Sequence, residues 1–254
     1  MDEPEVIFEN SDFVAINKPA GLMVHAARVS SKRRDVDEAR VAESTLVDWL
    51  TARWPEIKNV GDDPSLRPGI VHRLDKATSG VMIVAKTQAS FEHLKKLFQE
   101  HRMRKTYYAL VFGVPKNKSG VIDAPIGIKS GSLKRSVHSD KMAKLAVTEY
   151  SVVKEIAGEN NADENEKQQY ALLKVNPKTG RTHQIRVHLA SIGHPIVGDA
   201  LYGSKTSRAV AASDATGIFR SAPRLMLHAA ALEFSDDAGN RFAFEVPLPD
   251  DFVH

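Results

Sequence analysis

The first residues able to do chemistry lie in the segment 69–80, which reads Gly-Ile-Val-His-Arg-Leu-Asp-Lys-Ala-Thr-Ser-Gly. The carboxylate of Asp75 follows an apolar run and has Arg73 and Lys76 close on either side. Nearby positive charge favours the ionised form of a carboxyl group, and an ionised carboxylate can act as a nucleophile or a base. Structural ion pairs perturb carboxylates too, so this segment alone leaves a structural salt bridge or a cap open.

The apolar run predicts a strand that ends at Asp75. Side chains alternate between the faces of an extended strand, so His72 and Leu74 would share one face. Arg73 and Asp75 would share the other face. We therefore expect Leu74 to enter the core and Arg73 to accompany the carboxylate.

A second group lies in the segment 176–199, whose central part, 179–186, reads Thr-Gly-Arg-Thr-His-Gln-Ile-Arg. A helix is predicted over 182–192, ended by the glycine that follows. On it His183 and Arg186 would lie beside an apolar stripe. Backbone N–H groups at 180–182, together with Arg181, could meet an anion such as phosphate.

The histidines of this segment do not predict a metal site. His183, His188 and His194 are five and six residues apart, which is not the spacing of a helical pair. No carboxylate lies among them. We expect no metal here.

Composition narrows the class of protein. The 254 residues are 42% hydrophobic and 26% charged, which suits one large globular domain or two small ones. The chain has no cysteine, so disulfides, thiolate catalysis and cysteine zinc sites are excluded. The acidic start lacks the features of a signal peptide, and no apolar run approaches the roughly 20 residues of a membrane span. We expect a cytosolic protein, and its net charge of +3 is compatible with nucleic acid.

The pattern along the chain favours an α+β fold with a large mixed or mostly antiparallel sheet over a doubly wound fold, because strands outnumber helices and rarely alternate with them. The predicted strands cover 6–9, 13–17, 81–85, 107–112, 121–126, 145–153, 170–175, 224–234 and 241–246, and the predicted helices 44–54 (capped by Ser44), 88–101 and 182–192. The charged segment 28–43 is predicted to be a surface insertion, and 158–169 a hairpin loop.

A basic stretch separates two of these strands. Its cations, with one acidic residue among them, are Lys129, Lys134, Arg135, Lys141 and Lys144. Such charges could bind an RNA backbone, and the alternative is a solvated loop. The small residues at 130–132 predict that the stretch 129–144 is mobile.

Three linked motifs now indicate a family. They are the run from His72 to Gly80, Lys105-Thr106-Tyr107, and the run 179–186; the segments 17–21, 193–199 and 225–229 flank them. In this order, over nearly the whole chain, they resemble the RluA family of RNA pseudouridine synthases. The resemblance implies a single catalytic domain over 1–254, with helices and loops flanking the sheet and an active-site cleft across it. The S4-type RNA-binding domain that many relatives carry is not expected.

The resemblance also implies a reaction and its residues. Uridine in RNA would become pseudouridine without cofactor or metal, with Asp75 attacking C1′ or removing a proton from C2′. Tyr107 matches the active-site tyrosine; from the residues alone it could be an ordinary strand aromatic. Arg186 would pair with Asp75. Arg181 is the alternate partner of Asp75, although it is expected to contact phosphate instead. Arg73 would fill the gap left by the flipped uridine, whose extrusion costs on the order of a few kcal/mol.

We therefore expect an enzyme that acts as a monomer on ribosomal RNA, transfer RNA or both. The predicted RNA-binding residues are Arg73, Lys129, Lys134, Arg135, Lys141, Lys144, Arg181 and His183. One rival is a catalytically silent RNA-binding or ribosome-assembly protein. The other is a hydrolase, which would need a second carboxylate such as Asp199, although that residue is expected to fix a turn.

Overall fold

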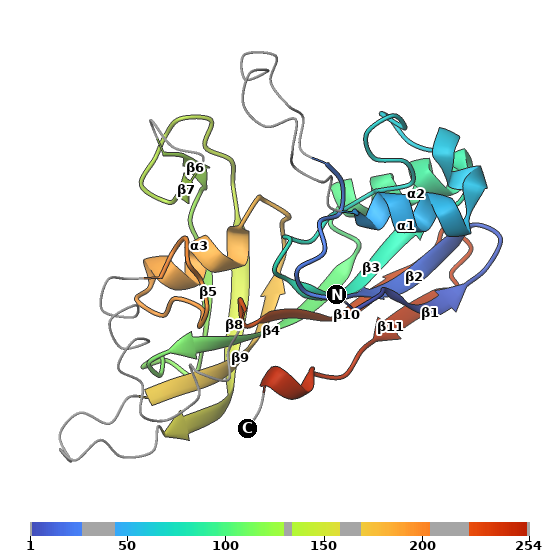
Figure 1. Ribbon diagram of the computed structural model, residues 1–254. Coiled ribbons are helices and arrows are strands. Elements are labelled where there is room, and N and C mark those ends of the chain that lie inside the picture. Colours follow the sequence, from blue (N-terminus) through green and yellow to red (C-terminus); the bar gives the residue numbers. More distant parts are fainter. Residues whose placement is uncertain (1, 27–43, 130–133, 158–168, 204–223, 253–254) are drawn as a thin grey trace, which may run out of the picture. The chain divides into compact units, whose positions relative to one another are not determined.

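The computed structural model describes residues 2–26, 44–129, 134–157, 169–203 and 224–252 (Figure 1). The chain divides into two compact units, Met1–Arg102 and Met103–His254, and each is described by itself. The expected insertion at 28–43 and the small residues at 130–132 lie outside the described residues, as does nearly all of the expected loop at 158–169.

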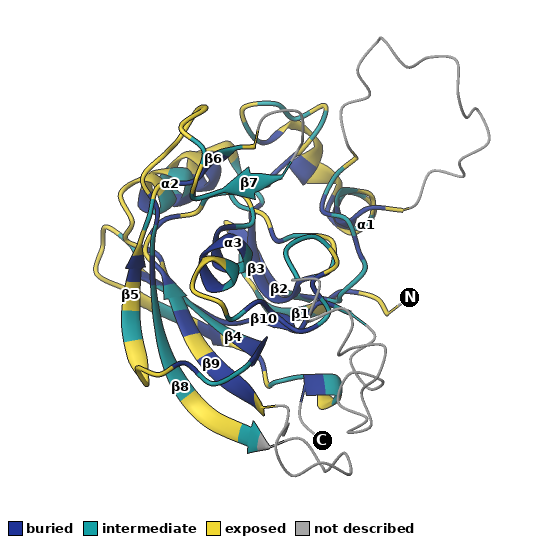
Figure 2. Ribbon diagram, turned by 90° about the vertical axis from the view of Figure 1, so that its left-hand side faces the viewer, coloured by how far each residue is buried: buried dark blue, intermediate teal, exposed yellow. Residues whose placement is uncertain are grey.

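The first unit is built on a three-stranded antiparallel sheet. Its strands are β1 (Glu5–Glu9), β2 (Phe13–Lys18) and β3 (Ser79–Ala85), with β2 in the middle. Every residue of β3 is buried, as its continuous apolar run predicted (Figure 2). The side chain of Asn10 accepts the N–H groups of Asp12 and Phe13, which closes the tight turn between β1 and β2.

Two helices and a 3-10 turn complete this unit. They are α1 (Leu46–Arg53), η2 (Pro55–Asn59) and α2 (Gln88–Gln99), which contacts β3. The N-cap of α1 is Thr45, not the predicted Ser44. Thr45 accepts the Asp48 N–H at 3.3 Å, and the Asp48 carboxylate accepts the Thr45 N–H at 2.8 Å. This reciprocal capping box satisfies two N–H groups at the start of α1.

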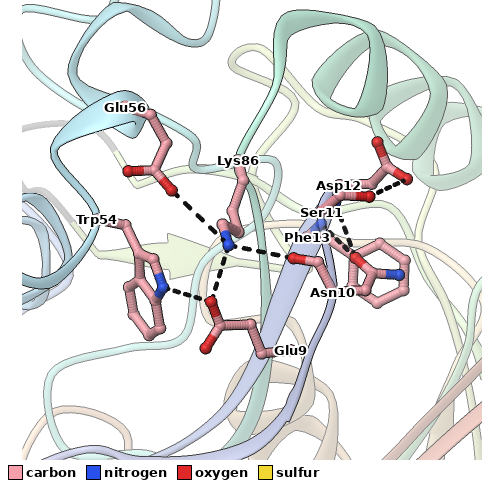
Figure 3. Close-up of polar contacts among 8 residues, drawn as sticks. All are labelled: Glu9, Asn10, Ser11, Asp12, Phe13, Trp54, Glu56 and Lys86. Atoms are coloured by element: carbon pink, nitrogen blue, oxygen red, sulfur yellow. Dashed lines mark hydrogen bonds and ion pairs between the residues drawn. The ribbon is translucent and has the colours of Figure 1, made fainter.

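A polar cluster joins the ends of three elements in this unit (Figure 3). The Lys86 ammonium lies 2.8 Å from Glu9 and 3.7 Å from Glu56, and it donates to the Asn10 carbonyl at 3.1 Å. The Trp54 indole N–H donates to Glu9 at 2.7 Å. Hydrogen bonds from Lys86 and Trp54 lower the pKa of Glu9. The cluster fixes the β1–β2 turn against the residues that follow α1 and β3.

The second unit holds a larger antiparallel sheet, with the order β10-β4-β9-β8-β5 and β11 paired to β10. The strands are β4 (Arg104–Phe112), β5 (Ser119–Asp123), β8 (Val147–Ala157), β9 (Gln169–Pro177), β10 (Leu227–Ser235) and β11 (Arg241–Glu245). These strands confirm the predicted α+β class.

Three smaller elements complete the second unit. The helix α3 (Gln184–Ser191) contacts β8 and β9 (Figure 1). A short hairpin pairs β6 (Gly127–Ile128) with β7 (Arg135–Ser136), and the 3-10 turn η3 (Asp250–Phe252) lies near the carboxyl end. Across the described ranges, no helix is both long and apolar enough to cross a bilayer.

Candidate active site

Asp75 lies on a loop, not at the end of a strand as predicted. Within the segment 70–75, Ile70 alone makes a β-bridge, with Val84, and the regular strand begins at Ser79. The Thr78 N–H donates to the Asp75 carbonyl at 3.1 Å, which closes a turn directly at the carboxylate. The side chain of Asp75 is half-buried, while Leu74 is buried as expected.

A buried lysine holds this turn in place. Lys18 is fully buried, and its ammonium donates to the carbonyls of Pro19 at 2.7 Å, Leu22 at 3.0 Å and Lys76 at 3.3 Å. The Gly21 N–H also donates to the Lys76 carbonyl, at 2.8 Å. The segment 17–21 is therefore fastened to the residue that follows Asp75. The sequence pattern predicted no role for Lys18, and its one signal is a lysine at the end of an otherwise apolar strand.

The residues before Asp75 have distinct surroundings. His72 stacks on Phe98 with ring centroids 4.5 Å apart, and the Ile83 N–H donates to its Nε2 atom at 3.0 Å. Because that nitrogen accepts a hydrogen bond, His72 is neutral with its proton on Nδ1. Arg73 is exposed, and one of its terminal nitrogens lies 3.1 Å from Nε2 of His25. Its exposure leaves Arg73 accessible to a nucleic acid.

Tyr107 lies on β4 and is half-buried. It is opposite Val175 in β9, and its neighbour Tyr108 is opposite Lys174, so the two tyrosines point to different faces of the sheet. Lys105, two residues earlier on the face of Tyr107, donates from its ammonium to the Thr179 carbonyl at 3.1 Å. Burial lowers the pKa of Lys105 to about 8.

The amide of Gln184 organises the 179–186 motif. Its oxygen accepts the Thr179 hydroxyl at 2.7 Å and the Arg181 N–H at 3.0 Å. Its nitrogen donates to the Val147 carbonyl and to the Thr148 hydroxyl, both at 3.0 Å. The Arg181 N–H, predicted as an anion donor, is thus engaged within the protein. The motif needs its glutamine at this position because one amide holds the loop to β8.

The helix α3 begins two residues later than predicted. His183 precedes it with φ +57°, a left-handed conformation, and gives it no side-chain cap. Its Nδ1 atom is 2.8 Å from the Tyr202 hydroxyl. His183 and Arg186 are half-buried beside the buried Ile185 and Leu189, which confirms the predicted stripes.

The other two histidines have structural contacts. His188 is buried between the Thr148 hydroxyl and the Ala124 carbonyl, each at 2.9 Å, and burial lowers its pKa. His194 bonds to the Phe112 carbonyl at 2.9 Å. In the described part of the chain, no group of three or more histidine or acidic side chains gathers to hold a metal ion.

Arg186 makes a bidentate ion pair with Asp199. The two distances are 2.8 Å from Nε to Oδ2 and 2.9 Å from Nη2 to Oδ1, and the Asp199 side chain is 1% exposed. Burial would raise the pKa of Asp199, but hydrogen bonds from Arg186, Leu201 and Tyr202 hold it below its usual value. Asp199 fixes a turn, as predicted; its pairing with Arg186 was not predicted. The expected partnership of Arg186 with Asp75 stays a prediction.

The basic stretch is folded where the structure describes it. Lys134 donates from its ammonium to the Leu201 carbonyl at 3.1 Å, and the Arg135 N–H donates to the Tyr202 hydroxyl at 3.0 Å. Lys129, Lys141 and Lys144 are exposed. The stretch therefore offers three cations to solvent while its hairpin is fastened beside the Asp199 turn.

Comparison with known proteins identifies relatives across the chain. The family described as RNA pseudouridylate synthase matches residues 12–191. "Ribosomal large subunit pseudouridine synthase D" of Pseudomonas aeruginosa is 38% identical over 99% of this chain and 70% of its own length. The protein of that name from Nitrosomonas europaea is also 38% identical, over 98% of this chain and 63% of its length. An uncharacterized RNA pseudouridine synthase of Aquifex aeolicus is 41% identical over 80% of this chain and 57% of its length.

Solved structures agree with the sequence relatives. "Human RNA Pseudouridylate Synthase Domain Containing 1" superposes with a TM-score of 0.70 at 25% identity, covering 99% of this chain and 85% of that one. "Human RNA Pseudouridylate Synthase Domain Containing 4" superposes with a TM-score of 0.67 at 25% identity, covering 98% of this chain and 90% of that one. The fold and the motifs thus agree with one assignment: the chain belongs to the RNA pseudouridine synthase family that its sequence resembled.

Proposed function

We propose that this chain isomerises specific uridines of large-subunit ribosomal RNA to pseudouridine. The observation that carries the proposal is the 38% identity, over nearly the whole chain, to proteins named ribosomal large subunit pseudouridine synthase D. The chain spans 57% to 70% of the length of the three relatives described above, so the activity of the whole relative is proposed here for the shared part.

Asp75 is the proposed catalytic carboxylate. In the reaction the bond from C1′ to N1 breaks, the base turns, and C1′ bonds to C5; N1 gains a proton and C5 loses one. A carboxylate can begin this exchange as a nucleophile at C1′ or as a base at C2′. The turn that Lys18 fastens would hold Asp75 in one position, and a fixed geometry is what either role requires.

Tyr107 and two arginines have proposed roles beside Asp75. Tyr107 would stack on the target base. Arg186, whose guanidinium is oriented by Asp199, would pair with the Asp75 carboxylate and hold it in position. Arg73, exposed on the Asp75 loop, would occupy the space of the extruded uridine.

The remaining cations would bind the RNA backbone. We propose phosphate contacts for the side chains of Lys129, Lys134, Arg135, Lys141, Lys144, Arg181 and His183. Lys134 and Arg181 each also bond a backbone carbonyl, so their contacts with RNA would use their other N–H groups. We propose that the protein acts as a cytosolic monomer.

Neither rival is favoured. A silent RNA-binding protein needs no carboxylate facing RNA phosphates. The usual glycosidase needs a second carboxylate with access to water or to the leaving group. Asp199, the second carboxylate in the motif segments, is 1% exposed and bound by Arg186.

The test measures tritium release from C5 of uridine in protein-free large-subunit ribosomal RNA, with transfer RNA as the comparison. Asp75→Asn should abolish release while RNA binding persists. Asp62→Asn is the matched control, because it removes an exposed loop carboxylate of the same unit that pairs with Lys95. Saturable release on ribosomal RNA supports the proposal. No release from the wild type, or full release from Asp75→Asn, contradicts it.

A further inference from the structure

The most exposed apolar side chains in the described part of the second unit include two that are only three residues apart. Met142 is 68% exposed and Leu145 is 74% exposed. Lys141 and Lys144, also exposed, lie directly before them in the chain. We call the residues 141–145 the Lys-Met-Ala-Lys-Leu loop. Single exposed apolar residues are ordinary, but two alternating with cations form a small surface of mixed chemistry.

The backbone of this loop is held by hydrogen bonds. Ile126 and Lys144 exchange N–H to carbonyl bonds of 2.9 and 3.1 Å, and the Ile128 N–H donates to the Lys141 carbonyl at 2.8 Å. Met142 has φ +52°, which is uncommon for a residue other than glycine. The exposed side chains thus project from a backbone that is already held in place, so a ligand loses little free energy to ordering this loop.

The same contacts place the loop next to the 179–186 motif. The Arg181 side chain donates from Nε to the Leu145 carbonyl at 3.0 Å. Ala146, the next residue, is fully buried in a cluster with Ile126 and Val187 of α3. A ligand that reaches the Arg181 guanidinium therefore meets the Lys-Met-Ala-Lys-Leu loop.

We propose that the Lys-Met-Ala-Lys-Leu loop binds unpaired bases of the RNA substrate, with Met142 and Leu145 against the bases and Lys141 and Lys144 on the phosphates. The inference rests on the proposed function for the identity of the polymer. Charge favours RNA over a protein partner, because lysine is depleted in protein interfaces, whereas phosphate is its common ligand. In A-form duplexes the base faces are stacked inside, so apolar side chains can reach them only where the strand is unpaired.

Binding of two RNA probes separates the two kinds of contact. The probes are a single-stranded oligouridine and a fully paired duplex of equal length, titrated over a range of salt concentrations. The double variant Met142→Ala/Leu145→Ala should bind the oligouridine about tenfold more weakly, leave duplex affinity within about twofold, and keep the salt slope. Lys141→Ala/Lys144→Ala should weaken both complexes and reduce the salt slope on the single strand by about 1.4.

Exposed valines provide the matched control. Val121 and Val153 are 64% and 53% exposed on β5 and β8, so Val121→Ala/Val153→Ala removes apolar surface elsewhere in the same unit. It should leave both affinities unchanged. All these side chains are exposed, and circular dichroism will verify that the variants fold.

The inference is overturned if Met142→Ala/Leu145→Ala binds oligouridine like the wild type, or if it loses affinity for both probes equally. Its failure is distinct from failure of the proposed function. Tritium release by the wild type tests the proposed isomerase activity, whereas the comparison of the two RNA probes tests the proposed base contacts of the loop. A wild type that releases tritium while the apolar variant binds normally contradicts the loop alone.

Discussion

The ion pair between Arg186 and Asp199 should be a large local contribution to the stability of the second unit. The pair is bidentate, and its side chains are 12% and 1% exposed. Removing one member of a buried pair leaves the other charge poorly compensated, which typically costs about 3–5 kcal/mol. Asp199→Asn keeps an oxygen for the N–H groups of Leu201 and Tyr202, so its cost arises at the contact with Arg186, where the variant loses both the charge and the acceptor of the Nε–H group.

A double-mutant cycle tests this reasoning. Asp199→Asn and Arg186→Met should each lower the free energy of unfolding by about 3 kcal/mol or more. The double variant should lose at least about 2 kcal/mol less of the free energy of unfolding than the two single variants lose together, because no charge then stays buried alone. Urea unfolding followed by circular dichroism is the assay. Circular dichroism reports directly on the strands of the second unit, whereas both tryptophans, Trp49 and Trp54, lie in the first unit.

The pH dependence of the free energy of unfolding provides a second test of the Arg186–Asp199 pair. The folded pKa of Asp199 is lowered, so its contribution is present above the unfolded carboxyl pKa of about 3.9 and is lost as pH falls through the folded value. The gap between wild type and Asp199→Asn should therefore shrink in acid. Asp62→Asn, which breaks an exposed pair, should cost less than about 1 kcal/mol. A cost for Asp199→Asn as small as that of the control would refute the reasoning.

Three further predictions concern the loops and strands around the site. Lys18→Met should lower kcat for tritium release more than it changes KM, because the buried Lys18 holds the turn at Asp75 and does not itself contact RNA. An equal loss of kcat in a surface variant, Lys58→Met, would contradict this. Gly198→Ala should lower Tm by several degrees, because its Cβ would lie 1.9 Å from the Arg224 carbonyl oxygen at φ +76°. The pKa of Lys105 is lowered to about 8 in the folded protein, so above that pH the unfolded chain binds more protons than the folded protein does. The free energy of unfolding should therefore rise from about pH 8 towards pH 10. Lys105→Met should remove that part of the rise in urea titrations; an unchanged pH profile would show that Lys105 is not its source.

The sequence determined the elements whose signals are local. The continuous apolar run of β3 and the amphipathic pattern of α2 were predicted within a few residues, because burial follows directly from such patterns. The three motifs indicated the RNA pseudouridine synthase family, which the comparisons confirmed. Family motifs keep their order and spacing along the chain, so they are visible before any fold is known.

Only the tertiary structure decided features that depend on partners far apart in the chain. Asp75 lies on a loop because the ammonium of Lys18, 58 residues from its acceptor Lys76, fixes a turn where the local pattern predicted a strand. Asp199, 13 residues after Arg186, meets it because the turn beyond α3 returns the chain to that helix. Sequence patterns report which residues are apolar or charged, whereas such contacts depend on where the folded chain places a donor and its acceptor.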